Sequence, residues 1–536
     1  MTDTSPLPVI WSIAGHDSGG GAGLSADQRA ADAMGVHLCP VVASVTAQNS
    51  TGVQAVYPLS PSQLDAQLKA LAQDMPPAAI KTGLLGDAVL IEVVAGWVRQ
   101  LRERTPDLPL VVDPVLGASA GGAAFCNDEI LWAYRRHLLP LATLITPNRA
   151  EACRLLGRPG RHDGPQHDQP DLALRLRELG ARNVVITGGD APSPDWALDW
   201  MDAAPHAHGW LCNRRVATRH HHGSGCTFAA AATSALALGH VCADAIVLAK
   251  MVTTQALQRA HVAGEGPGPV MASSGQALGP LPWLGIGRAL PWQLTHGDGT
   301  DTPLFKPFEP PADGLYGILP DSERLSAAAD AGLQCLQLRH KTLEGAAAHM
   351  SASAHACAQH GALLFINDHW QQALSMPVQP GLRLGIHLGQ EDLLALDESG
   401  CQPLLNARER VVLGLSSHSP WELARAAGCG ASLIACGPVL PTSTKDMPWV
   451  PQGADNLQWW VAHSPAPVVA IGGLLTPQDV ARFAASGAAA LCLVRGLGDS
   501  AEAMRATLPV LRQAASKGRI RVSPPSDRLQ LPHPVL

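Results

Sequence analysis

The chain lacks several features that would assign it at once to a broad class. Its formal net charge is −7 and its pI is near 6.3, so it has no excess of the basic residues that a nucleic-acid surface requires. No apolar run reaches the ~18 residues of a membrane-spanning helix. None of the twelve cysteines lies in a Cys-x-x-Cys pair or in a cluster with zinc-finger spacing. We therefore expect neither a nucleic-acid nor a membrane partner, whereas small anionic ligands need only a local cluster of donors.

Residues 1–15 also lack the basic segment that opens a signal peptide, and they run directly into strand-like sequence. Unpaired cysteines suit a reducing compartment, so we expect a cytoplasmic protein with small-molecule partners. What is present is apolar sequence: 46% of the 536 residues are hydrophobic, enough for more than one core at this length. The sequence leaves open whether the chain forms a homo-oligomer.

Short apolar runs alternate with helix-like stretches through residues 7–263. Such runs, separated by helices, predict parallel strands in an α/β layered domain. Residues 264–312 are rich in Gly and Pro and are predicted to form a linker, although its apolar piece at 282–292 (PWLGIGRALPW) could dock on a domain. Residues 313–515 contain eight strand candidates with helical stretches between most of them, which predicts a (β/α)8 TIM barrel. We expect an irregular, Pro-rich tail at 516–536.

Residues 221–236 (HHGSGCTFAAAATSAL) combine a turn of small residues with an Ala-rich helix. The N–H groups of Gly223, Ser224 and Gly225 would face an anion at the helix start. Cys226 would lie where a thiolate is stabilised and can act as a base. The alternative is a tight turn with a buried, inert cysteine. Residues 14–30 (AGHDSGGGAGLSADQRA) also place glycines before a helix, without Walker A spacing, and a capped turn is the alternative there.

Together with residues 45–53 (VTAQNSTGV), 111–117 (VVDPVLG) and 146–152 (TPNRAEA), these segments resemble the hydroxymethylpyrimidine/phosphomethylpyrimidine kinases of the ribokinase-like superfamily. The resemblance implies phosphoryl transfer from ATP to an aminopyrimidine, with Mg²⁺ as cofactor. It implies that Cys226 is the base and that Gly223, Ser224 and Gly225 form the anion hole. It also implies two binding sets, namely Gly15, Asp27 and Gln48 for the pyrimidine, and Asp113, Glu151 and Lys250 for ATP and Mg²⁺.

One residue departs from that family pattern. The kinases usually carry a lysine where this chain has Thr187, so a phosphate-facing ammonium is missing, and Lys250 is the candidate replacement. The histidine run 220–222 gives little support for a metal site, because adjacent residues on a strand face opposite sides.

In the predicted barrel, polar side chains follow the strands at their carboxyl ends, where barrel enzymes carry their chemistry. Carboxylates there could hold Mg²⁺, arginine and lysine could bind a diphosphate, and a glycine pair fits the usual barrel phosphate site. The residues are the acids Asp368 and Asp392, the cations Arg339, Lys341 and Lys445, and the glycines Gly472 and Gly473. For any one of them alone, the alternative is a polar group at the barrel rim.

The barrel segments resemble thiamine phosphate synthase, on the motifs QLRHK, FINDH, IHLGQEDL, GLSSHS, GPVLPTSTK and AIGGL. The resemblance implies condensation of the pyrimidine diphosphate with a thiazole phosphate, giving thiamine phosphate and pyrophosphate. It assigns Gln337, Arg339, Lys341, Asn367, Ser416 and Lys445 to the pyrimidine diphosphate, Thr442, Thr444 and Gly473 to the thiazole phosphate, and Asp368 and Asp392 to the metal. His340 and Arg495 depart from the family pattern, in which an acid and a small hydroxyl residue are common.

Two alternatives stay open for the first domain. It could phosphorylate another ring, such as pyridoxal. It could also be a binding module that has kept the fold without the activity, which the absence of the lysine at Thr187 favours.

Overall fold

A computed structural model describes residues 6–117, 126–158, 168–189, 195–274, 278–377, 379–396, 399–442, 449–521 and 532–533. The chain divides into two compact units between residues 282 and 283. Among the described residues no helix is long and apolar enough to cross a membrane.

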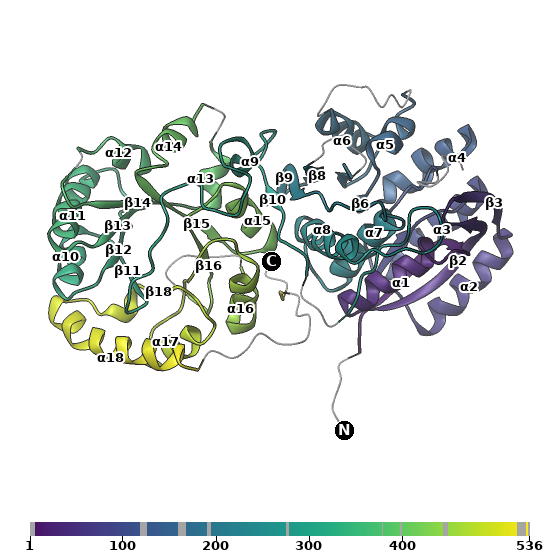
Figure 1. Cartoon of the computed structure of the whole chain (residues 1–536). Helices are drawn as coiled ribbons and strands as arrows, with labels where there is room; N and C mark the ends of the chain where they lie inside the picture. The colour runs from purple at the N-terminus through teal and green to yellow at the C-terminus, as the bar shows by residue number, and fades with distance from the viewer. Residues whose placement is uncertain are drawn as a thin grey trace. The chain divides into compact units, whose positions relative to one another are not determined.

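The first unit is built on one sheet with helices packed around it (Figure 1). Its strands are β1 (Val9–Asp17), β2 (His37–Asn49), β3 (Gly52–Pro58), β4 (Ala79–Thr82), β5 (Leu110–Val112), β6 (Leu144–Ile145), β7 (Asn183–Ile186), β8 (Trp196–Ala203) and β9 (Ala207–Arg214). Its helices are α1 (Gly23–Met34), α2 (Pro61–Asp74), α3 (Ala88–Arg104), α4 (Asp128–Ala133), η1 (Tyr134–Leu138), η2 (Leu139–Leu141), α5 (Arg149–Leu155), α6 (Gln169–Glu178), α7 (Ser224–Ala237) and α8 (Cys242–Gln258).

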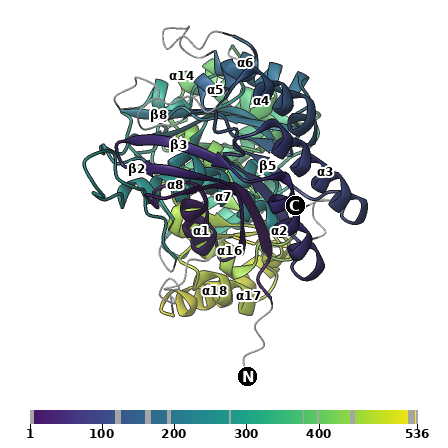
Figure 2. The same ribbon diagram turned by 90° about the vertical axis from the view of Figure 1, so that its right-hand side faces the viewer.

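The strands of this unit follow the order β9-β8-β7-β6-β5-β4-β1-β2-β3. Those from β7 through β2 are parallel, and β1 and β4, which lie between parallel neighbours, are almost wholly buried. The outer strands are antiparallel: β3 pairs with β2, and β8 joins β7 to β9. Figure 2 shows β2 and β3 running side by side as a ribbon. The sequence predicted the parallel strands but not these antiparallel ones.

The helices form two groups about the sheet. Helix α7 packs against α1 and α8 and contacts β1, β4 and β5, whereas α2 packs on α3 and β2, and α6 packs on α5 and β7. Gly35 ends α1 in a left-handed conformation with φ +73°, which glycine adopts without steric cost. The predicted α/β layered domain is confirmed.

The second unit is a closed barrel of eight parallel strands, in sequence order from β11 to β18. The strands are β11 (Leu315–Leu319), β12 (Cys335–Leu338), β13 (Leu363–Ile366), β14 (Arg383–Leu388), β15 (Val411–Ser417), β16 (Leu433–Cys436), β17 (Val468–Ala470) and β18 (Ala490–Leu493). The helical segments are α9 (Trp292–Thr295), α10 (Ser322–Asp330), α11 (Ala346–His360), α12 (Trp370–Leu374), α13 (Gln390–Leu394), α14 (Gln402–Asn406), α15 (Pro420–Gly428), α16 (Gly453–His463), α17 (Pro477–Ala484), η3 (Arg495–Leu497) and α18 (Ala501–Arg519).

The barrel interior is filled by apolar side chains from successive strands, including Tyr316, Phe365 and Leu433. Figure 1 shows α10, α11, α17 and α18 on the outside of these strands. Because the strands are parallel, their carboxyl ends meet at one end of the barrel. The predicted (β/α)8 barrel is confirmed, with all eight strands in the predicted segments.

The predicted linker, residues 264–312, is not a separate segment in the part that the structure describes. The Gly266 N–H donates to Ser50 Oγ at 3.1 Å, and Val270 N donates to His222 O, so this portion packs on the first unit. Lys306 N donates to Val411 O, and Trp292 and Phe305 are buried, so the later portion belongs to the barrel unit. At the other end, α18 continues to Arg519, past the predicted domain end at residue 515.

Candidate active sites

A cavity of about 240 Å³ opens in the first unit, where the start of α7 meets the strand ends. Ten residues singled out from the sequence line it: Gly15, Gln48, Asp113, Glu151, Thr187, Gly223, Ser224, Gly225, Cys226 and Lys250. Residues from seven separate segments of the chain are thus brought to one site. Asp27 is absent from this lining.

The turn before α7 depends on glycine. Gly223 is the N-cap with φ +84°, and a Cβ there would collide with the carbonyl oxygen of Gly21. The Ser224 N–H donates to His221 O at 3.2 Å, so it is already engaged. The predicted helix start at the cavity is therefore found, but the Ser224 N–H is not available for an anion as expected.

Cys226 lies in the first turn of α7 and lines the cavity. Burial raises the pKa of its thiol to about 12, although the positive charge of Lys81 acts to lower it. The expectation of a resting thiolate is corrected here, because desolvation outweighs the favourable helix start. At neutral pH the thiol carries its proton in this structure.

A buried ion pair lies behind the cavity. Lys81 Nζ is 3.0 and 2.9 Å from the two carboxylate oxygens of Asp27, and both side chains are fully buried. Ser12 Oγ donates to the same carboxylate at 2.6 Å. Asp27 is therefore committed to Ser12 and Lys81 and does not line the cavity, whereas Lys81 does, so the predicted direct contact of Asp27 with the pyrimidine does not fit this arrangement.

Asp113 lies on the other side of Lys81, with Oδ2 3.9 Å from Nζ. Burial raises the pKa of Asp113 to about 6, against the attraction of Lys81. Burial also opposes a charge on Lys81, but the nearby Asp27, Cys226 and Asp113 hold the pKa of Lys81 above its ordinary value. The Lys81 ammonium thus interacts electrostatically with two carboxylates and a thiol.

His222 contacts both Gln48 and the glycine loop, residues 17–22. Its Nε2 lies 3.0 Å from Asp17 Oδ2 and 3.2 Å from Gln48 Nε2. Asp17 Oδ2 also accepts from the Gly21 and Ala22 N–H groups, so this acid caps the loop, as one alternative proposed. Gln48 is consequently held at the cavity wall, where an amide could read an aminopyrimidine.

The residues expected around ATP are present but partly engaged. Glu151 accepts from Leu116 N at 3.2 Å and from Asn148 N at 3.0 Å, in a capping box that starts α5. Lys250 Nζ lies 2.7 Å from Asp199 Oδ2, and both side chains are buried. The charge of Lys250 is therefore already paired with Asp199. This argues against its expected role as a replacement for the lysine missing at Thr187.

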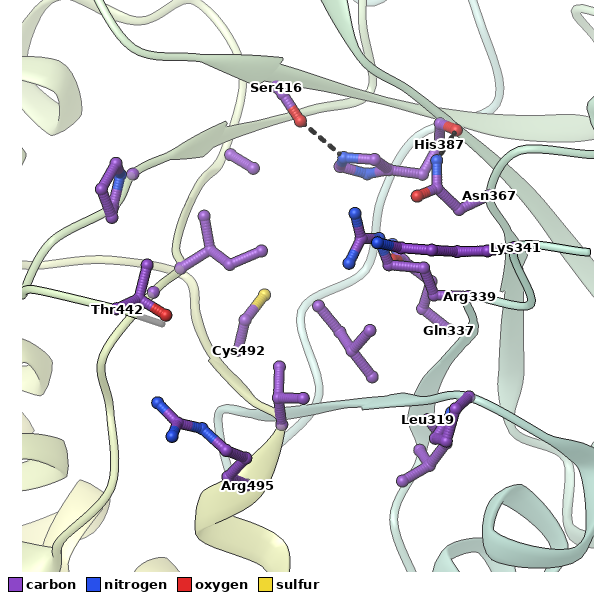
Figure 3. A pocket seen from close by; sticks show the side chains of 18 of the residues that line it. Leu319, Gln337, Arg339, Lys341, Asn367, His387, Ser416, Thr442, Cys492 and Arg495 are labelled. Carbon is purple, nitrogen blue, oxygen red and sulfur yellow. Dashed lines mark hydrogen bonds between the residues drawn. The ribbon is translucent and has the colours of Figure 1, made fainter. Parts of the chain in front are cut away.

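A larger cavity, of about 790 Å³, opens at the carboxyl ends of the barrel strands. Predicted residues that line it are Gln337, Arg339, Lys341, Asn367, Asp368, Asp392, Ser416, Thr442, Gly472 and Gly473. Figure 3 shows Gln337, Arg339, Lys341, Asn367 and Ser416 on the side of β12 to β15, with Thr442 and Arg495 on the opposite side. Thr444 and Lys445 lie outside the described residues.

His387 joins two of these side chains. Its Nε2 lies 3.0 Å from Ser416 Oγ, and its carbonyl oxygen accepts from Asn367 Nδ2 at 3.1 Å (Figure 3). Burial lowers the pKa of His387 to about 4, and the charge of Arg339 lowers it further, so the ring is neutral at pH 7. A neutral ring at the end of β14 can orient Ser416 without adding charge near the cations.

Both acids predicted to bind metal open on the barrel cavity. Asp368 is exposed and held at φ +63°, and Asp392 Oδ2 accepts from Gly389 N at 2.8 Å. Carboxylate oxygens that face the cavity are the donors that Mg²⁺ prefers, so the donor set fits that ion. No cluster of three or more His, Cys, Asp or Glu with metal-site geometry occurs among the described residues, so the remaining ligands of such an ion would come from substrate and water.

Comparison with known proteins assigns each unit. Residues 17–271 match the family described as phosphomethylpyrimidine kinase, and residues 318–497 match thiamine monophosphate synthase. The thiamine biosynthetic bifunctional enzyme TH1, chloroplastic, of Arabidopsis thaliana is 33% identical over 485 residues, which is 88% of this chain and 87% of the plant protein. The chain belongs to the family of bifunctional thiamine biosynthetic enzymes. It carries a hydroxymethylpyrimidine/phosphomethylpyrimidine kinase and a thiamine phosphate synthase.

Two further relatives of this bifunctional enzyme align with its kinase unit alone. A hydroxymethylpyrimidine/phosphomethylpyrimidine kinase of Synechococcus elongatus is 41% identical over 266 residues, covering 49% of this chain and 97% of that protein. A solved structure of pyridoxal kinase from Staphylococcus aureus, with AMP-PCP and pyridoxal, is 29% identical, covers 50% of this chain and 93% of its own, and has a TM-score of 0.44.

Three site residues of the bifunctional enzyme were missed by sequence reasoning, namely Lys81, His222 and His387. Each lay in a segment that was already singled out as a strand or motif. A charged residue within the apolar run AAIKTG was the available signal for Lys81, since an unpaired lysine is rarely buried. His222 and His387 gave no distinguishing signal, because their partners are distant in sequence.

Proposed function

We propose that the kinase unit transfers the γ-phosphoryl group of ATP first to the pyrimidine hydroxymethyl oxygen and then to the resulting monophosphate. Cys226 first loses its proton to solvent, and the resulting thiolate Sγ accepts the hydroxyl proton as the hydroxyl oxygen attacks the γ-phosphorus. The bond from the γ-phosphorus to the bridging β-phosphate oxygen breaks to release ADP. Gln48 orients the pyrimidine, and the Gly223–Cys226 turn faces the transferring phosphoryl group. Such chemistry needs mainly positioning and charge stabilisation.

Lys81 has a defined part in this proposal. Its positive charge lowers the pKa of the Cys226 thiol, against burial, which raises that pKa. It therefore stabilises the thiolate as that charge forms, and Asp27 and Ser12 hold it in place. Asp113 and Glu151 supply carboxylates on the side where ATP and Mg²⁺ would bind.

In the barrel, the pyrimidine diphosphate binds among Gln337, Arg339, Lys341, Asn367 and Ser416, and the thiazole phosphate binds at Thr442 and Gly473. The bond from the methylene carbon to the diphosphate oxygen breaks, and the thiazole nitrogen then forms the new C–N bond as pyrophosphate leaves. Mg²⁺ held by Asp368 and Asp392 would neutralise charge on the departing pyrophosphate. Thr444 and Lys445 are assigned by resemblance alone.

The observation that carries the proposal is the composition of the barrel cavity. Arg339 and Lys341, which follow β12, line one side and form no ion pair within the described part of the chain, and Thr442 lies on the opposite side (Figure 3). Gly472 and Gly473 also line the cavity, so its lining supports binding of a diphosphate and of a separate phosphate. The cytoplasmic location stays a prediction from the sequence, and the Arabidopsis relative is named as a chloroplastic protein.

A coupled assay tests both activities in one sample. Purified protein receives the hydroxymethylpyrimidine, the thiazole phosphate, ATP and Mg²⁺, and thiamine phosphate is measured. We expect product only when all four are present, and product without ATP when the pyrimidine diphosphate is supplied. An inactive kinase step, with tight pyrimidine binding and a working synthase step, would overturn the proposal for the first unit. Asp392→Asn should raise the Mg²⁺ concentration needed for half-maximal synthase activity.

A further inference from the structure

We propose that Arg495 binds the phosphate of the thiazole substrate and makes this synthase selective for the phosphorylated thiazole. The inference rests on the proposed synthase function and gives a role to a residue that departs from the family pattern and whose role the sequence left open. Arg495 is the first residue of η3, the short 3-10 helix that follows β18. Its side chain lines the barrel cavity.

Arg495 lies away from the cations at the other side of the cavity. In Figure 3 its side chain extends from the β18 side, below Thr442, whereas Arg339 and Lys341 come from the opposite side. The synthase joins two substrates that carry anionic groups, a diphosphate and a monophosphate. Two separated cationic positions in one cavity are complementary to that pair, and they keep the two anions apart.

The arginine is free to bind an anion. No ion pair holds Arg495 within the part of the chain that the structure describes, and its side chain is exposed at the cavity. Arg324 lines the same cavity but lies 3.9 Å from Asp321 and 3.6 Å from Asp499, so its charge is shared with two carboxylates. Arg324 therefore serves as the control, because it is an arginine of the same cavity whose charge is already paired with acids.

The backbone next to Arg495 forms the rest of the pocket. Gly473 has φ +79°, and a Cβ there would collide with the Leu440 side chain, so only glycine fits. A Cβ placed on Gly496 would lie 2.8 Å from Leu474 O, which shows that the loops after β17 and β18 are in direct contact. The proposed phosphate position at Gly473 and the arginine are thus on one continuous wall.

An arginine at this point differs chemically from the small hydroxyl residue common in the family. A hydroxyl gives one neutral hydrogen bond, whereas a guanidinium gives two parallel, charge-assisted ones to phosphate oxygens. The added binding depends on the phosphate charge. Arg495 should therefore raise affinity for the thiazole phosphate and not for the unphosphorylated thiazole alcohol.

The test compares three variants of the full chain in the synthase assay, with the pyrimidine diphosphate supplied. Arg495→Ser should raise the KM for the thiazole phosphate by about tenfold to a hundredfold. Its kcat and its KM for the pyrimidine diphosphate should change by less than about threefold. Arg495→Lys should fall between Arg495→Ser and the unmodified protein, because a lysine keeps the charge but not the paired hydrogen bonds. Arg324→Ser should leave the KM for the thiazole phosphate within about twofold.

A second readout separates charge recognition from a general structural effect. Calorimetric affinities for the thiazole phosphate and the thiazole alcohol should differ strongly in the unmodified protein and converge in Arg495→Ser, with an unchanged melting temperature. An unchanged KM and an unchanged affinity ratio in Arg495→Ser would overturn the inference while leaving the synthase function intact. If the unmodified protein made no thiamine phosphate, the proposed function itself would fail.

Discussion

Lys81 Nζ lies 2.9 Å from Asp27 Oδ2, and neither side chain has any exposed surface. Both charges of the pair act on the Cys226 thiol, and the lysine lines the kinase cavity while the aspartate does not. A buried ion pair is weak evidence for stability, since replacing both charges is often neutral whereas removing one partner is costly. Its place beside the thiol therefore suggests a role in the reaction that substitutions can separate from folding.

Lys81→Met alone should destabilise the kinase unit by about 3–5 kcal/mol, because it leaves Asp27 buried without its partner. The double variant Lys81→Met with Asp27→Asn should recover most of that loss. Its kinase kcat should nevertheless stay at least ~100-fold low, because no cation stabilises the thiolate. Chemical denaturation and steady-state kinetics measure the two effects. A double variant with near-normal kcat would reduce the pair to a structural role.

Cys226→Ala should lower the kinase kcat by about 10²–10⁴-fold, the usual contribution of a positioned base. Synthase activity with supplied pyrimidine diphosphate should be unchanged, which gives a control within the same chain. Cys242 also begins a helix but does not line the cavity, so Cys242→Ala should retain kinase activity.

The pH dependence of the kinase should follow the thiol. Because burial raises the pKa of Cys226 to about 12, the thiolate fraction of the free enzyme grows with pH throughout the accessible range. The kcat/KM for the pyrimidine should therefore rise between about pH 7 and pH 9. The residual activity of Cys226→Ala should not show this rise. A plateau already reached at pH 7 in the unmodified protein would contradict the assignment.

Thr187→Lys should lower the KM for ATP by about tenfold, since a charge-assisted hydrogen bond to a phosphate contributes about 1.5–3 kcal/mol. Thr187 lines the kinase cavity, and the charge of Lys250, which lines it too, is paired with Asp199. An added lysine would therefore supply a cation that Lys250 does not. Thr187→Met controls for side-chain size and should not lower the KM. Equal KM values for the two variants would show that phosphate binding is already satisfied by other groups.

His387 should make the barrel less stable in acid. Its folded-state pKa, about 4, is depressed below the ordinary 6.5 by burial, so the unfolded chain binds the proton more readily. Stability is thus fully present above pH 6.5 and falls as the pH drops toward 4, by about 3 kcal/mol in total. Hydrogen exchange of the β14 and β15 peptides at several pH values measures this loss.

His387→Gln should flatten this pH dependence, whereas His355→Gln, at an exposed position of α11, should leave it unchanged. A barrel whose acid sensitivity survives His387→Gln would show that other groups dominate the titration.

The sequence by itself determined which segments form the parallel strands and the helices between them, and where the glycine turns lie. Short apolar runs that end in turn residues, such as VIWSIAG, favour buried strands, and in the second unit eight such runs with helices between them close a barrel. Glycine in the turn at Gly223 and at the end of β17 likewise follows from local conformation. These features depend on neighbours along the chain, which a sequence displays directly.

Only the tertiary structure decided what each polar side chain contacts. Asp27 looked like a ligand of the substrate, yet packing places it against Lys81, which lies 54 positions away. Cys226 looked ionised from its helix start, yet desolvation by the surrounding strands keeps its proton. The sequence left the role of Arg495 open, because the cavity that its side chain lines exists only where β18 pairs with β11. Burial determines the charge state of a side chain, and contacts between distant segments determine its partners. Neither can be seen in the spacing of residues along the chain.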